Sequence, residues 1–346
     1  MSEAPQAAEV QQTPDQPGLP TEFLVSSAPH LGTSESTRRI MFEVVLAMLP
    51  LLAAATIFYG SRALVLTGVT VAACLATEAV ANAIRKRGQT SLSDGSAIVT
   101  GMILAFSLPP QLDLYMAAIG GAVAISLAKA IFGGLGQNLF NPAMVGRAFL
   151  MICFPAALGV WTEPGTLHTI GDMSIDGVTM ATPLQAAADA MPSMWDLFVG
   201  RVGGCLGEAS ALAALIGGLY LVLRRVADWR PVVGTLAGAF VVILIAKLAG
   251  SETTPASLWQ FSEYQLLAGA MMFGAFFIST DYVGAPLTPA GRLIFGLGVG
   301  ALVMIIRMFG AYPEGFMFAI LIMNALTPLI ERITVPTPFG GHVVTA

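Results

Sequence analysis

Long apolar segments recur along almost the whole chain, and they constrain its fold more than any other feature. An α-helix needs about 20 predominantly apolar residues to cross the hydrocarbon core of a bilayer. Hydrophobic residues make up 55% of the chain and charged residues only 11%, with a mean hydropathy of +0.77. This composition excludes an ordinary soluble domain. We expect an all-α, polytopic membrane protein with about ten transmembrane helices, at residues 40–59, 63–83, 94–109, 113–132, 142–160, 206–223, 231–249, 264–280, 291–308 and 315–331.

The apolar segments also divide the chain. Residues 1–36 are polar and rich in Pro, Gln and Ser, which predicts a partly disordered cytoplasmic tail and not a cleavable signal peptide. A first membrane half (37–160) and a second (206–332) flank a polar loop at 161–205, and residues 333–346 form a C-terminal tail. The third apolar segment is short and ends at Pro109-Pro110, so we expect a broken or only partly spanning helix there.

Basic residues between the apolar segments predict the orientation. Loops that carry more Lys and Arg remain in the cytoplasm. With the N-terminus inside, both termini are cytoplasmic and the 161–205 loop is extracytoplasmic. The inner side then carries Arg38, Arg39, Arg85, Lys86, Arg87, Arg224, Arg225, Arg230, Arg292 and Arg332, against Arg62, Arg201 and Arg307 on the outer side.

Two segments of the chain resemble each other. Residues 117–149 and 293–326 each run from a Gly-rich helix through a late cation to Phe-Gly, and a further helix follows. They lie five predicted spans apart, so they would have opposite orientations in the membrane. Inverted repeats of this kind build sites near the midplane from interrupted helices. We therefore expect two inverted five-helix repeats, the alternative being that Gly-rich spans resemble each other by composition.

Polar residues inside the apolar segments are the candidates for an ion path or gate, because a charge within a bilayer usually faces a cavity or a partner. The alternatives are pairing between helices and, near a helix end, snorkelling to the interface. Phe273 and Phe277 could form an aromatic constriction or simply pack. The polar set comprises Glu78, Lys129, Asn138, Asn141, Arg147, Glu208, Lys247, Asp281 and Asn324, of which Glu78, Lys129, Glu208 and Asp281 are the predicted path residues.

The three cysteines, Cys74, Cys153 and Cys205, are scattered singly and have no ligand-like spacing. We interpret them as small apolar packing residues and expect no metal site within this chain.

The stretch DGVTMATPLQ at residues 176–185 stands in the long polar loop. Thr182 is a good helix N-cap, since Pro183 takes the first helical position and Gln185 completes a capping box. A cap alone would explain these residues. A phosphate esterified to Thr182 is compatible with the same geometry, because a helix N-terminus stabilises an anion.

The pattern Asp176, Thr179, Ala181, Thr182 resembles the flavin-attachment motif of the Rnf and Na⁺-translocating NADH:quinone reductase families, commonly Asp-x-x-Ser/Thr-Gly-Ala-Thr. Met180 stands where that motif usually has Gly. The likeness continues at 26–50, 132–150, 207–219, 279–296 and 312–332, which resemble segments of the RnfD family, a membrane component of the Rnf complex. NqrB, the corresponding component of the quinone reductase, is a close relative with a longer N-terminal region, so the short tail favours Rnf.

This resemblance implies a subunit of a ferredoxin/NAD oxidoreductase coupled to Na⁺ or H⁺ translocation, which is not catalytic alone. It implies FMN held covalently through the Thr182 oxygen, a second, non-covalent riboflavin as an option, and a bacterial inner-membrane location. It also implies that the partners are the other Rnf subunits, a flavin transferase and membrane lipid, and no nucleic acid. The chain has no nucleotide-binding motif, so NAD and ferredoxin would bind to partner subunits.

Two other functions remain open from the sequence. The chain could be the NqrB component of a Na⁺-translocating NADH:quinone reductase. A channel or transporter for a small solute, without a redox role, would also have ten spans in inverted halves, an analogy at the level of fold alone.

Overall fold

The computed structural model describes residues 36–85, 89–162, 164–165, 192–249, 258–310 and 314–336. All but Ser36 belong to one unit of the chain, Thr37–Ala346. Within these residues the secondary structure is helical and contains no strand. The all-α prediction is therefore confirmed for the part of the chain that the structure describes.

Five helices are long and apolar enough to cross a membrane, judged by length and composition. Each coincides with one of the predicted apolar segments, and together they make this a multi-pass membrane protein. They are α1 (Thr37–Tyr59), α2 (Ser61–Ile84), α9 (Trp229–Leu248), α12 (Pro289–Phe309) and α13 (Phe316–Thr334).

The other predicted segments form shorter or interrupted helices. Pro155 follows the end of α5 because proline supplies no N–H and clashes with the preceding turn. A π-helical turn continues α4, and another follows α11. The elements are η1 (Gln89–Asp94), α3 (Ser96–Phe106), α4 (Leu114–Ile125), η2 (Ser126–Ala130), α5 (Pro142–Cys153), α6 (Pro155–Leu158), α7 (Met194–Val199), η5 (Leu206–Glu208), α8 (Ala211–Leu223), α10 (Leu258–Leu267), α11 (Met271–Phe273) and η6 (Gly274–Ile278).

Side-chain caps fix where several of these helices begin. Asn141 accepts hydrogen bonds from the amides of Ala143 and Met144 at the start of α5. Ser210 caps α8 and Thr288 caps α12 in the same way. These residues satisfy backbone N–H groups that have no partner within the helix. They also place polar side chains at breaks between apolar helices.

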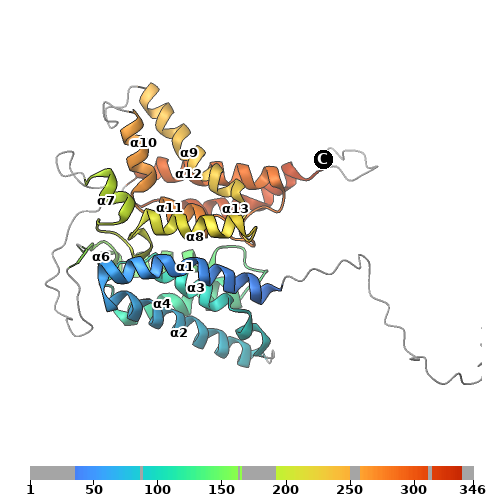
Figure 1. The fold of residues 1–346 in the computed structure, drawn as a ribbon. Helices are drawn as coiled ribbons and strands as arrows, with labels where there is room; N and C mark the ends of the chain where they lie inside the picture. Colours follow the sequence, from blue (N-terminus) through green and yellow to red (C-terminus); the bar gives the residue numbers. More distant parts are fainter. Residues whose placement is uncertain are drawn as a thin grey trace, which may run out of the picture. The chain divides into compact units, whose positions relative to one another are not determined.

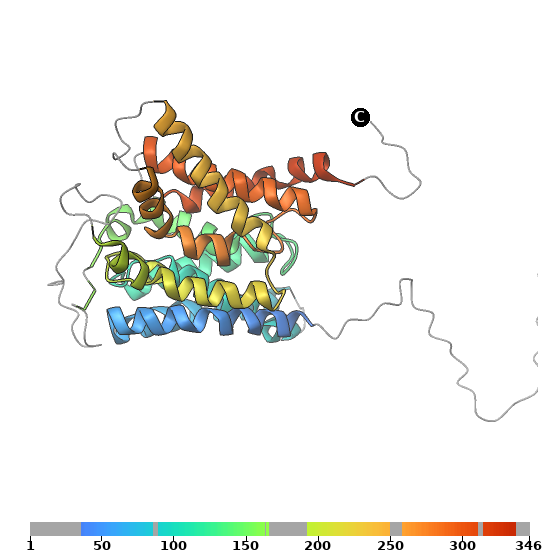
Figure 2. The ribbon, with the colours of Figure 1, turned by 45° about the horizontal axis from the view of Figure 1, so that its top comes forward.

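Helix packing divides the unit into two groups that meet along α1 and α8. In the first group α2 packs against α3 and α4, and α4 packs against α5. In the second group α9 packs against α12, and α12 packs against α13. Figure 1 shows α1 and α8 side by side between these groups, and the turned view in Figure 2 preserves that contact.

Glycines bring α9 and α12 into close contact. Each helix carries two glycines four residues apart, Gly234 and Gly238 on α9, Gly296 and Gly300 on α12. A Cβ atom built on Gly234 would lie 3.0 Å from the Cα of Gly296. Such spacing lets two backbones approach without side chains between them. The crossing is visible in Figure 2.

Candidate functional site

The first polar cavity, which we call the Asp281 cavity, has a volume of about 100 Å³ and lies between the two helix groups. Asn141, the cap of α5, donates from Nδ2 to Oδ2 of Asp281 at 3.2 Å. The backbone N–H of Asn141 donates to the side-chain oxygen of Asn324 on α13 at 2.9 Å. Residues from both predicted halves thus hold the Asp281 carboxyl at the cavity wall.

Lys129 reaches the same cavity from the π-helical turn η2. Its Nζ lies 2.6 Å from Oε1 of Glu78 on α2 and 2.6 Å from Oγ of Ser96 at the start of α3. Both charged side chains are at least 95% buried. A buried charge needs such partners, because desolvation otherwise opposes burial. Helix pairing, one of the two interpretations open from sequence, therefore describes the Glu78–Lys129 contact, and Lys129 lines the cavity as well.

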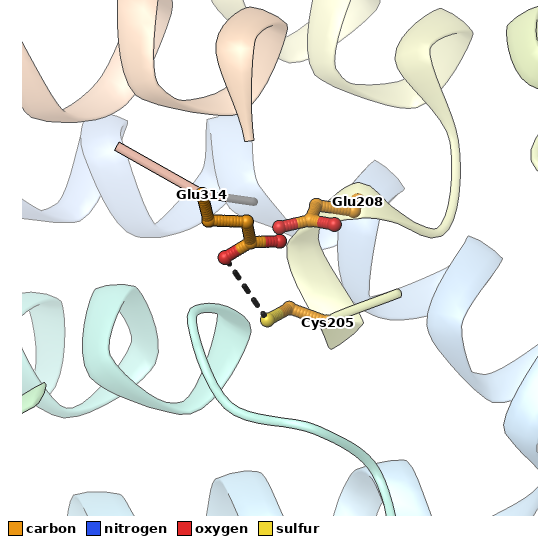
Figure 3. A group of neighbouring side chains, drawn as sticks. All are labelled: Cys205, Glu208 and Glu314. Atoms are coloured by element: carbon orange, nitrogen blue, oxygen red, sulfur yellow. Dashed lines mark hydrogen bonds between the residues drawn. The ribbon is translucent and has the colours of Figure 1, made fainter. Parts of the chain in front are cut away.

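A second cavity of about 230 Å³, the Glu208 cavity, is lined by acidic, basic and aromatic side chains. Glu208 belongs to η5, and Glu314 precedes α13. Arg147 on α5 donates to Oε2 of Glu314 and forms an ion pair with it. Figure 3 shows the carboxyl groups of Glu208 and Glu314 facing each other. Carboxylates from two separate elements are thus concentrated at one point in the interior.

Cys205 lies beside these carboxyls, and its sulfur lies within 4.8 Å of an oxygen from each. Its Sγ donates to the carbonyl of Ser107 at 3.1 Å and lies 4.0 Å from Oε2 of Glu314 (Figure 3). A metal ligand must be a thiolate, whereas this sulfur is placed as a hydrogen-bond donor. Cys205 therefore packs and donates here.

Aromatic rings stand between the two cavities. Phe277 lines the Asp281 cavity, and Phe273 and Phe106 line the Glu208 cavity. The rings of Phe273 and Phe277 are stacked with centroids 5.7 Å apart, and Phe106 meets Phe273 edge to face at 6.0 Å. All three side chains are buried. Opening a passage between the cavities would require these rings to change rotamer.

Several basic residues meet at one end of the helices. Arg224, after α8, binds Glu43 of α1 at 2.8 Å, and Arg292 of α12 binds Asp228 at 2.7 Å. Asp228 also accepts from Arg230. Burial alone would raise the pKa of the Asp228 carboxyl, but hydrogen bonds from the Arg230 amide and from the Arg292 and Arg230 guanidinium groups hold that pKa below its usual value.

The structure brings the predicted path residues together in two places. Glu78, Lys129, Asp281 and Phe277 lie at or beside the Asp281 cavity, and Glu208 and Phe273 line the other. Four motif residues, Asp176, Thr179, Ala181 and Thr182, lie outside the described residues.

Sequence reasoning missed the role of Glu314 and treated Arg147 as a residue that could snorkel. It also placed Arg307 in an outer connection, whereas Arg307 lies in the last turn of α12. Its guanidinium donates to the backbone carbonyls of Gln265 and Ala268 at 2.7 and 3.1 Å. The available signal for Glu314 was a lone acid between Pro313 and Gly315 at the start of the last apolar segment.

Comparison with known proteins identifies the family. The model of the NQR2, RnfD, RnfE family matches residues 24–340. The subunit named D in the Na⁺-translocating ferredoxin:NAD⁺ oxidoreductase complex of Acetobacterium woodii is 41% identical, over 91% of this chain and 95% of that protein. Its namesake in the proton-translocating ferredoxin:NAD⁺ oxidoreductase complex of Clostridium ljungdahlii is 38% identical, over 92% and 96%. Its namesake in the ion-translocating oxidoreductase complex of Aeromonas salmonicida is 36% identical, over 92% and 99%. This chain therefore belongs to the NQR2, RnfD, RnfE family.

Proposed function

We propose that this chain is the membrane flavoprotein subunit of an Rnf-type complex, a ferredoxin/NAD oxidoreductase coupled to Na⁺ or H⁺ translocation, and that it carries FMN covalently on Thr182. Relatives named as components of such complexes match over nearly their full length, which supports a subunit of an ion-translocating oxidoreductase with the other complex subunits as partners. The observation that carries the flavin proposal is the Asp176, Thr179, Ala181, Thr182 pattern inside the matched range 24–340.

The cofactor, when bound, supplies one-electron redox chemistry. A phosphoester at Thr182 would prevent its loss, and a helix N-terminus there would stabilise the phosphate. Trp161, at the start of the polar loop, lines the Glu208 cavity together with Phe106, Phe273 and Arg147. Aromatic faces beside a guanidinium group suit a flavin ring, and this supports a site for it at that end of the unit.

Two features support the finer membrane topology: ten spans, inverted five-helix repeats and cytoplasmic termini in the bacterial inner membrane. The order of helix packing is the same in both groups, since α2 on α4 and α4 on α5 correspond to α9 on α12 and α12 on α13. The basic residues Arg224, Arg230 and Arg292, all assigned to the inner side from sequence, meet at one end through Glu43 and Asp228. The motif loop would then be extracytoplasmic.

The alternatives are weaker. The NqrB component of a Na⁺-translocating NADH:quinone reductase is a close relative, but the proteins compared above are components of ferredoxin:NAD⁺ or ion-translocating oxidoreductase complexes, and they are matched over 95% or more of their length. A solute channel without a redox role gives no reason for a flavin-attachment motif and does not share those relatives.

Peptide mass spectrometry tests the covalent flavin. The chain is purified from cells that supply a flavin transferase, and the peptide containing Thr179 and Thr182 is examined for the added mass of FMN less water. We expect complete loss of the modification in Thr182→Ala and its retention in Thr179→Ala. A wild-type peptide that stays unmodified, while Met180→Gly becomes modified, would show that Met180 disables the motif. Unmodified peptide in both would remove the proposal.

The same preparation tests the non-covalent riboflavin. Flavin released into the supernatant by acid precipitation is counted against flavin retained on the protein, and we expect riboflavin in the released fraction. Its absence from a preparation with full FMN occupancy would limit the chain to one flavin.

Ion translocation is proposed to run through the two cavities, with Phe273 and Phe277 as the gate between them. Asp281 and Glu208 each present a carboxyl at a cavity wall. In the assembled complex, we expect Asp281→Asn and Glu208→Gln each to reduce ion uptake by vesicles at least about tenfold, the factor that a lost charge interaction of about 1.4 kcal/mol produces. Ion uptake and electron transfer that both remain at wild-type rates would exclude these carboxyls from the path.

A further inference from the structure

The carboxyl groups of Glu208 and Glu314 form a site that the redox proposal does not use. They come from elements more than a hundred residues apart in the sequence, η5 and the segment before α13, and their oxygens face each other in Figure 3. One oxygen from each, together with Cys205 Sγ, lies within 4.8 Å. Two carboxylates so near each other in a protein interior repel strongly unless something positive lies between them.

Both groups keep an oxygen without a partner. Oε1 of Glu208 and Oε1 of Glu314 are buried and accept no hydrogen bond from the described residues. The Glu314 side chain is only 9% exposed, and both residues line the 230 Å³ cavity. Unsatisfied oxygens are costly in an interior. The arrangement therefore leaves room for one more donor, held by the carboxyls themselves.

The neighbouring charges do not fill this place. Arg147 is engaged with Oε2 of Glu314. Arg307 directs two nitrogens at the carbonyls of Gln265 and Ala268, at the C-terminal end of α10, where the helix dipole is negative. No ion pair joins Glu208 to either arginine within the described residues. Glu208 is thus the acid whose charge lacks a direct counter-charge.

The remaining titratable neighbours act as donors to other groups. Cys205 donates its thiol hydrogen to the carbonyl of Ser107. The Tyr59 hydroxyl of α1 donates to the carbonyl of Val202 at 3.3 Å. Neither hydrogen is available to Glu208. Two carboxylate groups also offer too few oxygens, on their own, for the six or more that a hard metal cation such as Ca²⁺ takes.

We propose that the Glu208–Glu314 pair binds one proton, shared between the two facing carboxyl groups, at the wall of the Glu208 cavity. Of the pair, Glu314 keeps its charge towards Arg147, and the proton neutralises Glu208. A shared proton belongs to the pair and not to one residue. This inference rests on the proposed ion path, to which it adds a proton-binding site, but it requires neither the flavin nor the other subunits.

Infrared difference spectroscopy on the full-length chain in lipid nanodiscs tests the site. A protonated carboxyl gives a C=O stretch that shifts in D₂O, and a carboxylate does not. At neutral pH we expect the wild-type spectrum minus that of Glu208→Gln, and minus that of Glu314→Gln, to show the same D₂O-sensitive band. Asp113→Asn, which removes an exposed acid at the start of α4, should leave the band intact.

Three results would overturn the proposal. They are the absence of any band lost in both variants, loss in only one of them, and loss of the wild-type band when NaCl replaces choline chloride, which would make the occupant Na⁺. Since Glu314→Gln leaves Arg147 without its partner, the variant Arg147→Gln/Glu314→Gln is measured beside it, and helix content is checked by circular dichroism. A normal band in a chain that lacks covalent FMN would support the proton site while contradicting the flavin proposal.

Discussion

Replacing Lys129 with methionine is expected to lower the free energy of unfolding by about 3–5 kcal/mol, the usual cost of removing one partner from a buried ion pair. The Lys129 side chain is 3% exposed and the Glu78 side chain 5% exposed. Without the lysine, the Glu78 carboxylate loses its contact at 2.6 Å and stays among apolar helices. Unfolding by SDS in mixed micelles, followed by circular dichroism, measures the change.

A double variant separates the ion pair from simple packing. In Lys129→Met/Glu78→Met both charges are replaced by apolar side chains, which is often neutral or stabilising. Ser96, the other partner of Lys129, still donates to Asp94 at 2.5 Å. We therefore expect most of the lost stability to return. Arg332→Met, at an exposed position in the last turn of α13, should cost less than about 1 kcal/mol. Equal stability of Lys129→Met and wild type would show that the pair does not hold η2 to α2.

The helical segments could be predicted from sequence because each depends on a local property. Every one of the ten apolar segments coincides with one or more helices. The interruptions were less accessible. Pro155 is a visible signal for a break, whereas the π-helical turns at Ser126–Ala130 and Gly274–Ile278 have no residue pattern of their own. Such turns arise where tertiary packing makes an extra residue per turn favourable, often at functional positions.

The site could be predicted only as a set of residues. Glu78 and Lys129 are recognisable from sequence as charges within apolar segments, but their contact joins residues 51 positions apart. Glu314 stands at a helix boundary, where an acid is ordinary, so nothing local distinguishes it. Its burial and its approach to Glu208 follow from how the two helix groups meet. Long-range placement of this kind depends on packing that no local pattern encodes.

The combination of rigid and openable parts is consistent with a coupled membrane subunit. The Asp281 and Glu208 cavities are separated by stacked Phe273 and Phe277, whereas the α9–α12 contact is made by backbone against backbone. Aromatic side chains can change rotamer while closely packed backbones cannot give way. Movement between the cavities would therefore be confined to side chains, and the helices that carry them would keep their places.

Gly300→Ala is expected to lower the free energy of unfolding by about 1–3 kcal/mol, the usual cost of overpacking. A Cβ at Gly300 would meet the carbonyl of Thr235 and lie 2.7 Å from the amide nitrogen of Ala239, both backbone atoms of α9 that cannot move aside. Gly238→Ala on the facing helix should act alike, and the double variant should cost less than the sum because both residues separate the same two helices.

Gly68→Ala is the matched control, since it changes an exposed glycine within α2 that has open space around its Cβ position. Alanine is the better helix former by about 1 kcal/mol, so this variant should be as stable as wild type or more so. The two substitutions are chemically identical and are expected to have opposite signs under the same SDS titration. If both stabilise, the α9–α12 crossing is looser than backbone contact. If both destabilise equally, the cost of Gly300→Ala does not come from that crossing.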